Sequence, residues 1–401
     1  MVADELALRL ADDYVKPGSR VLDPFCGSGR LLAASDTAAT RIGIDANPLA
    51  WLISTAKLAN VDVEELRGFL LKLTEGSITH GPSLSFMTGR RVRWFSEEVE
   101  GQLSQLVHWV NRQCASESAL YVIGSILSAT ARECSFARQS GWKLHRLSEF
   151  DRLVKRKDPW TVFRRRLAYC VLDLGGRKYR HGEFSVIRGV TGLANLEKAS
   201  IGGKFDVVLT SPPYGDSRTT VQYGAASELC LSVVRHINGL DHLFAKGSEI
   251  DADCIGGRAA YIDSSLQERC LRDYWAGSAK NPAAGRVRRF LAAYDNTCRD
   301  ISNVISPDGR AVFIVGRRST GGFRVKLDDF TISTFEERGF TFERRFERHL
   351  RQKRSPKWIN RYGRASDDVQ SRGSVPTFDR DIVIVMRKLP KTTGSAPNTV
   401  R

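Results

Sequence analysis

The stretch SRVLDPFCGSGRLLAASD, residues 19–36, indicates the fold class. SRVLDPF predicts a strand, and CGSGRLLAASD predicts a tight glycine turn that leads into a helix. Next, TRIGIDA predicts a second strand that ends on Asp45, and NPLAWLISTAKLAN predicts a helix with Asn47 as N-cap and Pro48 in its first turn. This order of elements is typical of a parallel α/β sheet.

The turn between the first strand and the first helix has the features of a ligand loop. Gly27 and Gly29 allow the backbone to approach a ligand closely. A dinucleotide fingerprint would have a third glycine at position 32, where this chain has Leu32, so NAD fits poorly. Asp45 can accept hydrogen bonds from both ribose hydroxyls. The loop therefore predicts a nucleoside-containing cofactor; the alternative is a glycine turn that serves only helix–sheet packing.

A second loop, TSPPY, follows the predicted strand KFDVVLTS. Ligands of parallel sheets bind beyond the carboxyl ends of the strands, so this loop should face the same crevice as the glycine turn. Pro212 and Pro213 have a fixed φ and no N–H, so the segment presents carbonyl acceptors beside the Ser211 hydroxyl and the Tyr214 ring. Such acceptors can hold an aryl amine while Tyr214 stacks on its ring. Plain turn chemistry is the alternative.

Together, DPFCGSG, GIDANP and TSPPY resemble the cofactor, acidic and catalytic motifs of S-adenosylmethionine-dependent amino-methyltransferases of DNA. The resemblance covers residues 17–60 and 184–230 well and residues 286–388 loosely. It implies an α/β fold with a seven-stranded, Rossmann-like methyltransferase sheet, mostly parallel, in which RDIVIVMRK is the antiparallel last strand. A helical insert would interrupt this sheet.

The resemblance also implies two sets of site residues. One set would bind S-adenosylmethionine: Asp23, Pro24, Phe25, Gly27, Gly29 and Asp45. The other would hold the target amine: Ser211, Pro212, Pro213 and Tyr214. Serine before Pro-Pro-Tyr is more similar to the cytosine-N4 enzymes than to the adenine-N6 enzymes. An RNA guanine-N2 methyltransferase and a non-catalytic DNA-binding protein on the same fold are further alternatives.

The chain departs from the family pattern at several points. Its cofactor motif precedes its catalytic motif, whereas many enzymes with this catalytic motif have the reverse order. Arg30 replaces the usual threonine, and Val190 stands where an acid would reach the adenine amine. Asp216 is a candidate for orienting the catalytic loop or accepting a proton late, and it is equally suited to capping a turn.

The charge of the chain indicates a polyanionic partner. Lys and Arg number 61 against 45 Asp and Glu, which gives a formal net charge of +16. Aromatic residues are interleaved with one basic cluster, and a second cluster spans residues 344–364. Each cluster alone is as often a solvated face. Beside a base-modifying loop, we predict that the first cluster contacts duplex DNA through Lys143, Arg146, Lys155, Arg156, Lys157, Arg164 and Arg165.

These patterns predict how the chain is divided. Residues 1–60 would form the cofactor-binding first half of the methyltransferase domain, and residues 181–388 its catalytic second half. Residues 61–180 would form the helical, basic insert and the candidate DNA-recognition region. Residues 225–285 have no clean period, so they are predicted to be irregular and are the alternative recognition region. Residues 389–401 are predicted to be a disordered tail.

The remaining composition excludes several classes of protein. Eight cysteines contain no C-x-x-C pair and no zinc spacing, which predicts reduced thiols and no metal. No apolar run could span a membrane, and the amino-terminal residues lack a signal-peptide pattern, so a cytoplasmic protein is expected. The combined prediction is a site-specific methyltransferase of a restriction-modification system that modifies cytosine N4 in double-stranded DNA. A cognate restriction endonuclease is a candidate partner.

Overall fold

The computed structural model describes residues 2–74, 81–86, 94–113, 115–139, 144–154, 157–176, 182–214, 223–255, 282–320, 323–349, 358–359, 375–376 and 380–390. No helix within these ranges is long and apolar enough to cross a membrane. Lys143, Lys155, Arg156 and Asp216 lie outside the described residues, as do residues 391–401 of the predicted tail.

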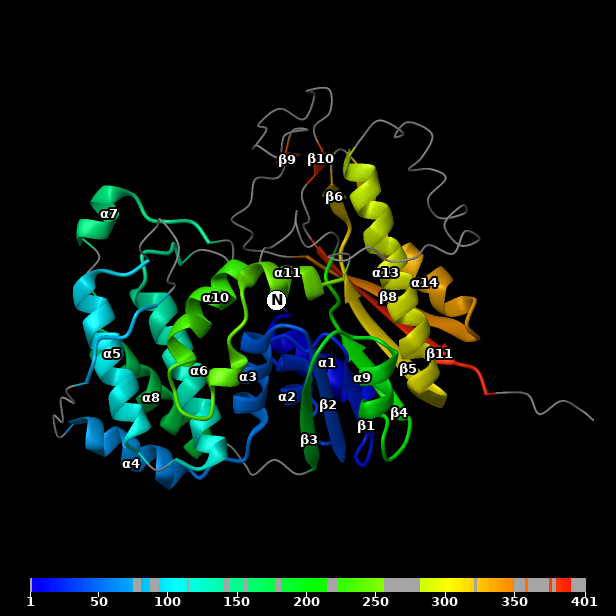
Figure 1. The fold of residues 1–401 in the computed structure, drawn as a ribbon. Helices are drawn as coiled ribbons and strands as arrows, with labels where there is room; N and C mark the ends of the chain where they lie inside the picture. Colours follow the sequence, from blue (N-terminus) through cyan, green and yellow to red (C-terminus); the bar gives the residue numbers. More distant parts are fainter. Residues whose placement is uncertain are drawn as a thin grey trace, which may run out of the picture.

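A seven-stranded sheet forms the centre of the molecule (Figure 1). In spatial order its strands are β3 (Glu183–Arg188), β2 (Thr40–Asp45), β1 (Arg20–Asp23), β4 (Phe205–Thr210), β5 (Ile305–Val315), β11 (Arg380–Lys388) and β8 (Phe340–His349). The first five pair in parallel, whereas β11 runs antiparallel to both β5 and β8. This order confirms the predicted α/β fold, with RDIVIVMRK as the antiparallel strand.

Helices cover both faces of the sheet because its inner strands are apolar on both sides. In β11, Ile382 and Ile384 belong to one hydrophobic cluster and Val383 and Val385 to another. The first cluster packs against α9 (Leu193–Ala199), α13 (Pro282–Val304) and α14 (Leu327–Glu336). The second packs against α1 (Asp4–Tyr14) and α2 (Arg30–Ala34). Two short antiparallel pairs complete the described strands: β6 (Arg318–Thr320) with β7 (Phe323–Val325), and β9 (Trp358–Ile359) with β10 (Val375–Pro376).

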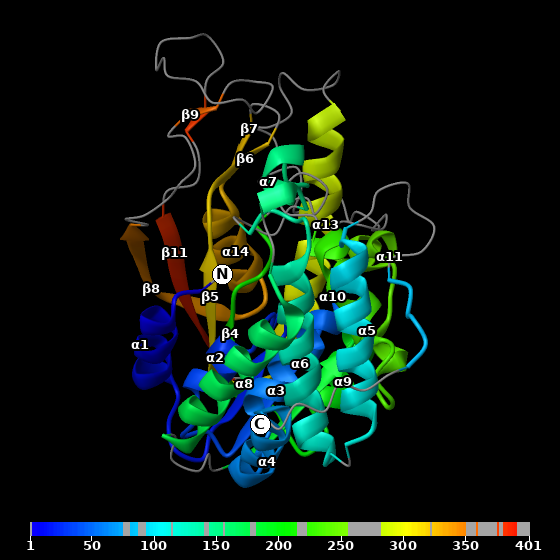
Figure 2. The ribbon, with the colours of Figure 1, turned by 90° about the vertical axis from the view of Figure 1, so that its left-hand side faces the viewer.

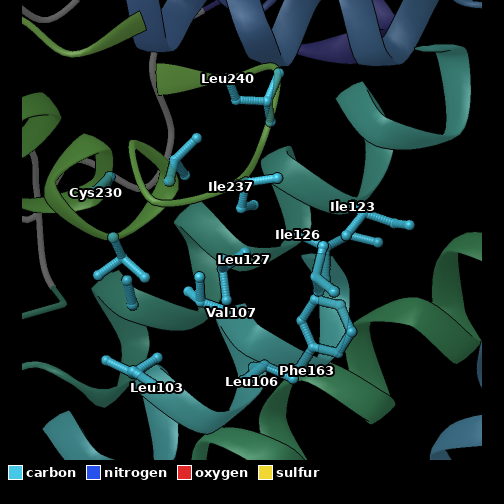
Figure 3. Packing of buried hydrophobic residues seen from close by; sticks show 14 of the residues in the cluster. Leu103, Leu106, Val107, Ile123, Ile126, Leu127, Phe163, Cys230, Ile237 and Leu240 are labelled. Atoms are coloured by element: carbon cyan, nitrogen blue, oxygen red, sulfur yellow. The ribbon is translucent and has the colours of Figure 1, made fainter. Parts of the chain in front are cut away.

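A block of helices lies beside the sheet, which confirms the predicted helical insert (Figure 1). It contains α4 (Val63–Thr74), α5 (Glu97–Asn111), α6 (Glu117–Cys134), α7 (Glu149–Val154) and α8 (Pro159–Gly175). Side-chain caps from Ser96, Ser116 and Asp158 begin three of these helices. Figure 3 shows the core of the block, to which α3 (Pro48–Leu58) also contributes.

The prediction of irregular structure over residues 225–285 is wrong for residues 225–253. These residues form most of α10 (Tyr223–Val234), then the 3-10 turn η1 (Asp241–Leu243) and α11 (Gly247–Asp253). Ten of the twelve residues of α10 are buried, and Cys230, Ile237 and Leu240 point into the core of the helical block (Figure 3). A helix that is buried on nearly all sides has no polar stripe, so its sequence shows no helical period. Residues 256–281 lie outside the described part of the chain.

Candidate active site at the carboxyl edge of the sheet

A buried hydrogen bond joins the two loops that the sequence identifies as functional. β1 and β4 are parallel neighbours, with Leu22 paired to Val208. At their carboxyl ends, the Thr210 hydroxyl donates to Asp23 Oδ1 over 2.6 Å. Both residues are inaccessible to solvent, at 0% and 1% exposure. The sheet therefore brings TSPPY beside DPFCGSG, although 187 residues separate the bonded pair.

The carboxylate of Asp23 is the centre of this junction. Its Oδ1 also accepts the N–H of Phe25 over 3.2 Å. Burial raises the pKa of Asp23 to about 7, while the bonds from Thr210 and Phe25 oppose the rise and the nearby Asp45 adds to it. Asp23 thus links the two loops through its hydrogen bonds to Thr210 and Phe25. Thr210 is a candidate site residue that the sequence-based prediction missed. Polar residues at the ends of two adjacent apolar strands were the available signal.

Glycines shape the loop after β1. Gly27 has φ +50° and Gly29 has φ +69°, both in the left-handed region that favours glycine. A Cβ on Gly29 would lie 2.9 Å from Ser54 Cβ on α3, so this position needs glycine for close packing as well. A Cβ on Gly27 would meet only the Phe25 carbonyl oxygen, at 4.0 Å. The Gly27 backbone therefore has open space beside it, where a ligand can approach.

Amide groups of this loop are used within the protein rather than offered to an anion. The N–H of Gly27 donates to Asp45 Oδ2 over 2.8 Å, and the N–H of Cys26 donates to the Ile44 carbonyl over 3.1 Å. The N–H of Gly29 donates to the Cys26 carbonyl over 2.7 Å. A phosphate-binding loop needs such donors for its ligand. The geometry therefore fits a cofactor without phosphates better than a dinucleotide.

Asp45 lies at the end of β2, where the ribose of a cofactor was predicted to bind. Its two oxygens accept the N–H groups of Gly27 and Asn47, each over 2.8 Å. Burial raises the pKa of Asp45, although these two bonds counteract the rise. Each carboxylate oxygen has a second lone pair, so Asp45 can still accept ribose hydroxyls. The free acceptor capacity of Asp45 and the open space beside Gly27 together fit the ribose and the rest of S-adenosylmethionine.

Asn47 connects the cofactor side of the site to α10. Its side chain accepts the N–H of Leu49 over 3.0 Å, which confirms the predicted N-cap of α3. Its amide nitrogen donates to Ser227 Oγ over 2.8 Å. One side chain thus starts α3 and holds α10, the first described helix after the catalytic loop.

The TSPPY loop, which was predicted to be catalytic, is described as far as Tyr214. Pro212 is buried, whereas Ser211, Pro213 and Tyr214 are half-buried at the edge of the sheet. The hydroxyls of Ser211 and Tyr214 form a hydrogen bond of 3.0 Å. Burial raises the pKa of Tyr214, with Asp381 contributing in the same direction, so the phenol stays neutral. The loop thus presents neutral hydroxyls, which can accept hydrogen bonds from an amine.

The departures from the family pattern have structural explanations. Arg30, in place of threonine, holds α1 against the loop: its guanidinium pairs with Asp4 over 3.2 Å and donates to the Val2 carbonyl over 2.7 Å. Val190 follows the end of β3 and is 46% exposed. Its neighbour Thr191 donates to the Pro24 carbonyl. Position 190 therefore offers an apolar surface near the cofactor loop rather than an acceptor.

Four of the predicted DNA-contact residues lie within the described chain. Lys157 and Arg165 donate to Glu133, each over 2.7 Å, and Arg166 joins them over 2.6 Å. Arg146 lies against the Phe136 ring, 5.8 Å from its centroid, and Arg164 is exposed. These residues belong to the helical block and not to the strands of the sheet. The described residues contain no group of three metal-ligating side chains.

Comparison with known proteins adds one informative similarity. No family model matches the chain. The chain is 24% identical to the type II methyltransferase M.MvaI of Kocuria varians in an alignment of 377 residues that covers 85% of this chain and 80% of that protein. The solved rRNA methyltransferase aviRa of Streptomyces viridochromogenes aligns with 96% of this chain and 85% of its own, at 11% identity and a TM-score of 0.33. That TM-score adds nothing to the fold class, which rests on the strand order. The sequence similarity to M.MvaI, however, supports a methyltransferase.

Proposed function

We propose that this protein transfers a methyl group from S-adenosylmethionine to the exocyclic N4 amine of cytosine in duplex DNA. The observation that carries the proposal is the buried Thr210–Asp23 hydrogen bond, which fixes the TSPPY loop against the cofactor loop. The similarity to a type II methyltransferase favours DNA as the substrate and a restriction-modification system as the context. In that context the protein would act in the cytoplasm, with a cognate restriction endonuclease as its functional partner.

The residues of the two loops would divide the work of the reaction. S-adenosylmethionine, when bound, supplies an electrophilic methyl group. Asp45 would hold the ribose, and the loop from Asp23 to Gly29 would surround the rest of the cofactor. Ser211 and the carbonyl of Pro212 would accept the two N–H bonds of the target amine, while the Tyr214 ring stacks on the base. These acceptors would hold the nitrogen in line with the methyl carbon and the sulfur, and would stabilise the positive charge that develops on the nitrogen. The N–C bond would form as the S–C bond breaks, which leaves S-adenosylhomocysteine, and the nitrogen would release one proton to solvent.

No covalent attack by cysteine is part of this proposal. Cys26 is the cysteine nearest the cofactor glycines in sequence, and it is 5% exposed. Burial raises the pKa of the Cys26 thiol well above its usual value, so it stays protonated at neutral pH. A neutral, buried thiol is a packing group, and methylation of an exocyclic amine needs no nucleophile at a ring carbon.

Duplex DNA would reach the loops by base flipping and would be held by basic side chains. A paired base must leave the stack before its amine reaches the site, at roughly a few kcal/mol. Arg146, Lys157, Arg164 and Arg165 remain candidates for phosphate contacts, as do Lys143, Lys155 and Arg156 outside the described residues. Three cations surround Glu133, so that cluster keeps an excess of two positive charges.

Parallel reactions on unmodified duplex DNA and on RNA, with radiolabelled S-adenosylmethionine, test the function. Enzymatic digestion of the DNA to nucleosides should give labelled N4-methyl-2′-deoxycytidine. Label only in N6-methyladenine would show that the base assignment is wrong, and label only in RNA as N2-methylguanine would overturn the choice of DNA. Absence of S-adenosylmethionine binding in calorimetry would instead favour a non-catalytic DNA-binding protein.

Two variants tie the reaction to the catalytic loop. Ser211→Ala removes one amine acceptor, and Tyr214→Ala removes the stacking ring, so both should lose most of the methyl transfer. Calorimetry should show that both still bind S-adenosylmethionine, because neither residue is in the cofactor loop. Ser200→Ala is a matched control: Ser200 ends α9 and its hydroxyl donates to the Glu197 carbonyl, away from both loops. Its activity should equal that of the wild type.

A further inference from the structure

Helix α7 has the reverse of the usual polarity of a surface helix. Phe150, Leu153 and Val154 are 74%, 72% and 67% exposed. Their spacing of three and four residues places them on one face of the helix. Arg152 instead turns inward, with its guanidinium 5.8 Å from the centre of the Phe136 ring. None of the six residues of α7 is buried.

Backbone and charged contacts, not apolar burial, hold α7 in place. Leu147, just before the helix, donates to the Phe136 carbonyl over 2.8 Å, and Arg138 donates to the His145 carbonyl over 2.8 Å. The Ser148 side chain accepts the N–H of Asp151 over 3.1 Å and so caps the first turn. Because these contacts fix the helix, its outward apolar face is not needed for its own folding.

α7 itself carries two exposed carboxylates, Glu149 and Asp151, and the surface beyond them is basic. Arg146 and Arg152 both lie against the Phe136 ring, and Arg138 is exposed on the adjoining hairpin. Nearby, the three cations on Glu133 keep exposed side chains: 41% for Lys157, 47% for Arg165 and 36% for Arg166. The cations around this small apolar face outnumber the carboxylates of Glu149, Asp151 and Glu133, so the region as a whole is complementary to a nucleic-acid groove bordered by phosphates.

The position of α7 matches a duplex that also reaches the catalytic loop. Figures 1 and 2 both place α7 at the same end of the molecule as β6, and Figure 2 also shows β7 there. β6 begins at Arg318, three residues after β5 ends at Val315, so this end is also the carboxyl edge of the sheet. DNA lying across this end could therefore contact α7 while its target base enters the site.

We propose that α7 is a groove-contacting element for duplex DNA. Phe150, Leu153 and Val154 contact the sugars and base edges in a groove beside the target base, and the neighbouring cations contact the phosphates. The inference rests on the proposed function, because it takes the same DNA as the substrate. It adds a surface that the helical block contributes to binding.

The proposal is tested with a triple variant that combines Phe150→Ala, Leu153→Ala and Val154→Ala. Its DNA binding is measured by fluorescence anisotropy with a labelled, unmodified duplex that contains the sequence methylated by the wild type. DNA binding should weaken roughly tenfold, the scale of losing specific groove contacts. Since no charge is removed, the slope of log affinity against log salt should stay the same. Arg164→Ala should instead reduce that slope by about 0.9 for one lost phosphate contact. Binding of S-adenosylmethionine should be unchanged in all variants.

Ile201→Ala is the matched control for exposed apolar area. Ile201 is 76% exposed, and its carbonyl accepts a bond from Arg20 at the opposite, amino edge of the sheet. This variant should bind DNA as the wild type does. Unchanged DNA affinity in the triple variant would overturn the proposal. A dimer in the wild type that becomes a monomer in the triple variant, with DNA affinity unchanged, would show that α7 binds a second copy instead.

Failure of the proposed function would be distinguishable from failure of this inference. If the wild type methylates no polynucleotide, the proposed function fails, and a mixed-sequence duplex then serves as the binding probe for the same variants. If the wild type methylates DNA and the triple variant has the same KM for DNA, only the role of α7 fails.

Discussion

The Thr210 hydroxyl and the Asp23 carboxylate are joined by a 2.6 Å hydrogen bond between the ends of two adjacent parallel strands. Neither side chain reaches solvent, so the bond is part of the sheet as well as of the site. Loop position and sheet stability therefore depend on the same pair, and both can be measured.

Thr210→Val keeps the shape of the side chain but removes the donor to Asp23. A buried acceptor without its partner costs about 1–3 kcal/mol, so the free energy of unfolding should fall by this amount. Methyl transfer should fall as well, because Ser211 is the next residue along the chain. Urea unfolding and initial rates measure the two effects. Thr210→Ser retains the hydroxyl and should restore most of both; if it does not, the methyl packing of Thr210 matters more than its bond.

The raised pKa of Asp23 predicts an unusual pH dependence of stability. The folded value is about 7 and the ordinary value is 3.8, so between these values the folded state holds a proton that the unfolded state has lost. The contribution of Asp23 to stability is therefore fully present below pH 3.8 and is lost as pH rises to about 7. Urea unfolding of the wild type and of Asp23→Asn across this range isolates the group. The wild type should lose stability relative to the variant as pH rises, and a constant difference would contradict the prediction.

Gly29→Ala should damage the cofactor loop in two ways. Its positive φ costs a residue with a Cβ about 1–2 kcal/mol, and the new Cβ would lie 2.9 Å from Ser54 Cβ. Gly18→Ala separates these effects, because Gly18 has φ +84° and nothing within 4 Å of its Cβ position. Calorimetric titration should show weaker S-adenosylmethionine binding for Gly29→Ala only. Gly18 lies in the turn before β1, so equal loss in both variants would show that general destabilisation by a Cβ at positive φ, and not contact with α3, weakens binding.

Glu133→Gln should destabilise the helical block. Burial opposes ionisation of Glu133, but hydrogen bonds from Lys157, Arg165 and Arg166 outweigh it and lower the pKa to about 2. The ionised form therefore stabilises the fold above the ordinary pKa of 4.5, and this contribution is lost as pH falls to about 2. The difference in Tm between wild type and variant should be large at pH 7 and should shrink below pH 4.5. Because water partly screens the exposed cations, a small difference at pH 7 would mean that screening dominates.

Local sequence patterns predicted the individual strands and the positions of the two loops, and the resemblance to a methyltransferase family supplied the seven-stranded sheet. Asn47 caps α3 as predicted, and the apolar strands end at the predicted polar residues. The Thr210–Asp23 bond was harder to foresee because it depends on which strands are neighbours, and adjacency of β1 and β4 is not encoded in either segment alone. Once a parallel sheet is predicted, residues at equal depth on adjacent strands are the ones to compare.

Two other features were missed for different physical reasons. α10 has no amphipathic period because the helical block surrounds it, so its sequence appears irregular. α7 shows apolar residues at helical spacing, which normally predicts a buried face, and here that face is outward. The same apolar spacing can therefore belong to a buried face or to an exposed face, depending on tertiary packing. No local sequence signal distinguishes these two cases.

The position of β11 between β5 and β8 determines when the sheet can be completed during synthesis of the chain. Both functional loops have been synthesised by Tyr214, but the strand between β5 and β8 comes from residues 380–388, whose central side chains are fully buried. A nascent chain that lacks them leaves the apolar edge of β5 without a neighbour and β8 detached. Ribosomes add about 5–20 residues per second, so roughly ten seconds or more separate the catalytic loop from closure of the sheet. During that interval the sheet would be incomplete, and the strand that carries Asp381, whose charge acts on Tyr214, would be the last to join it.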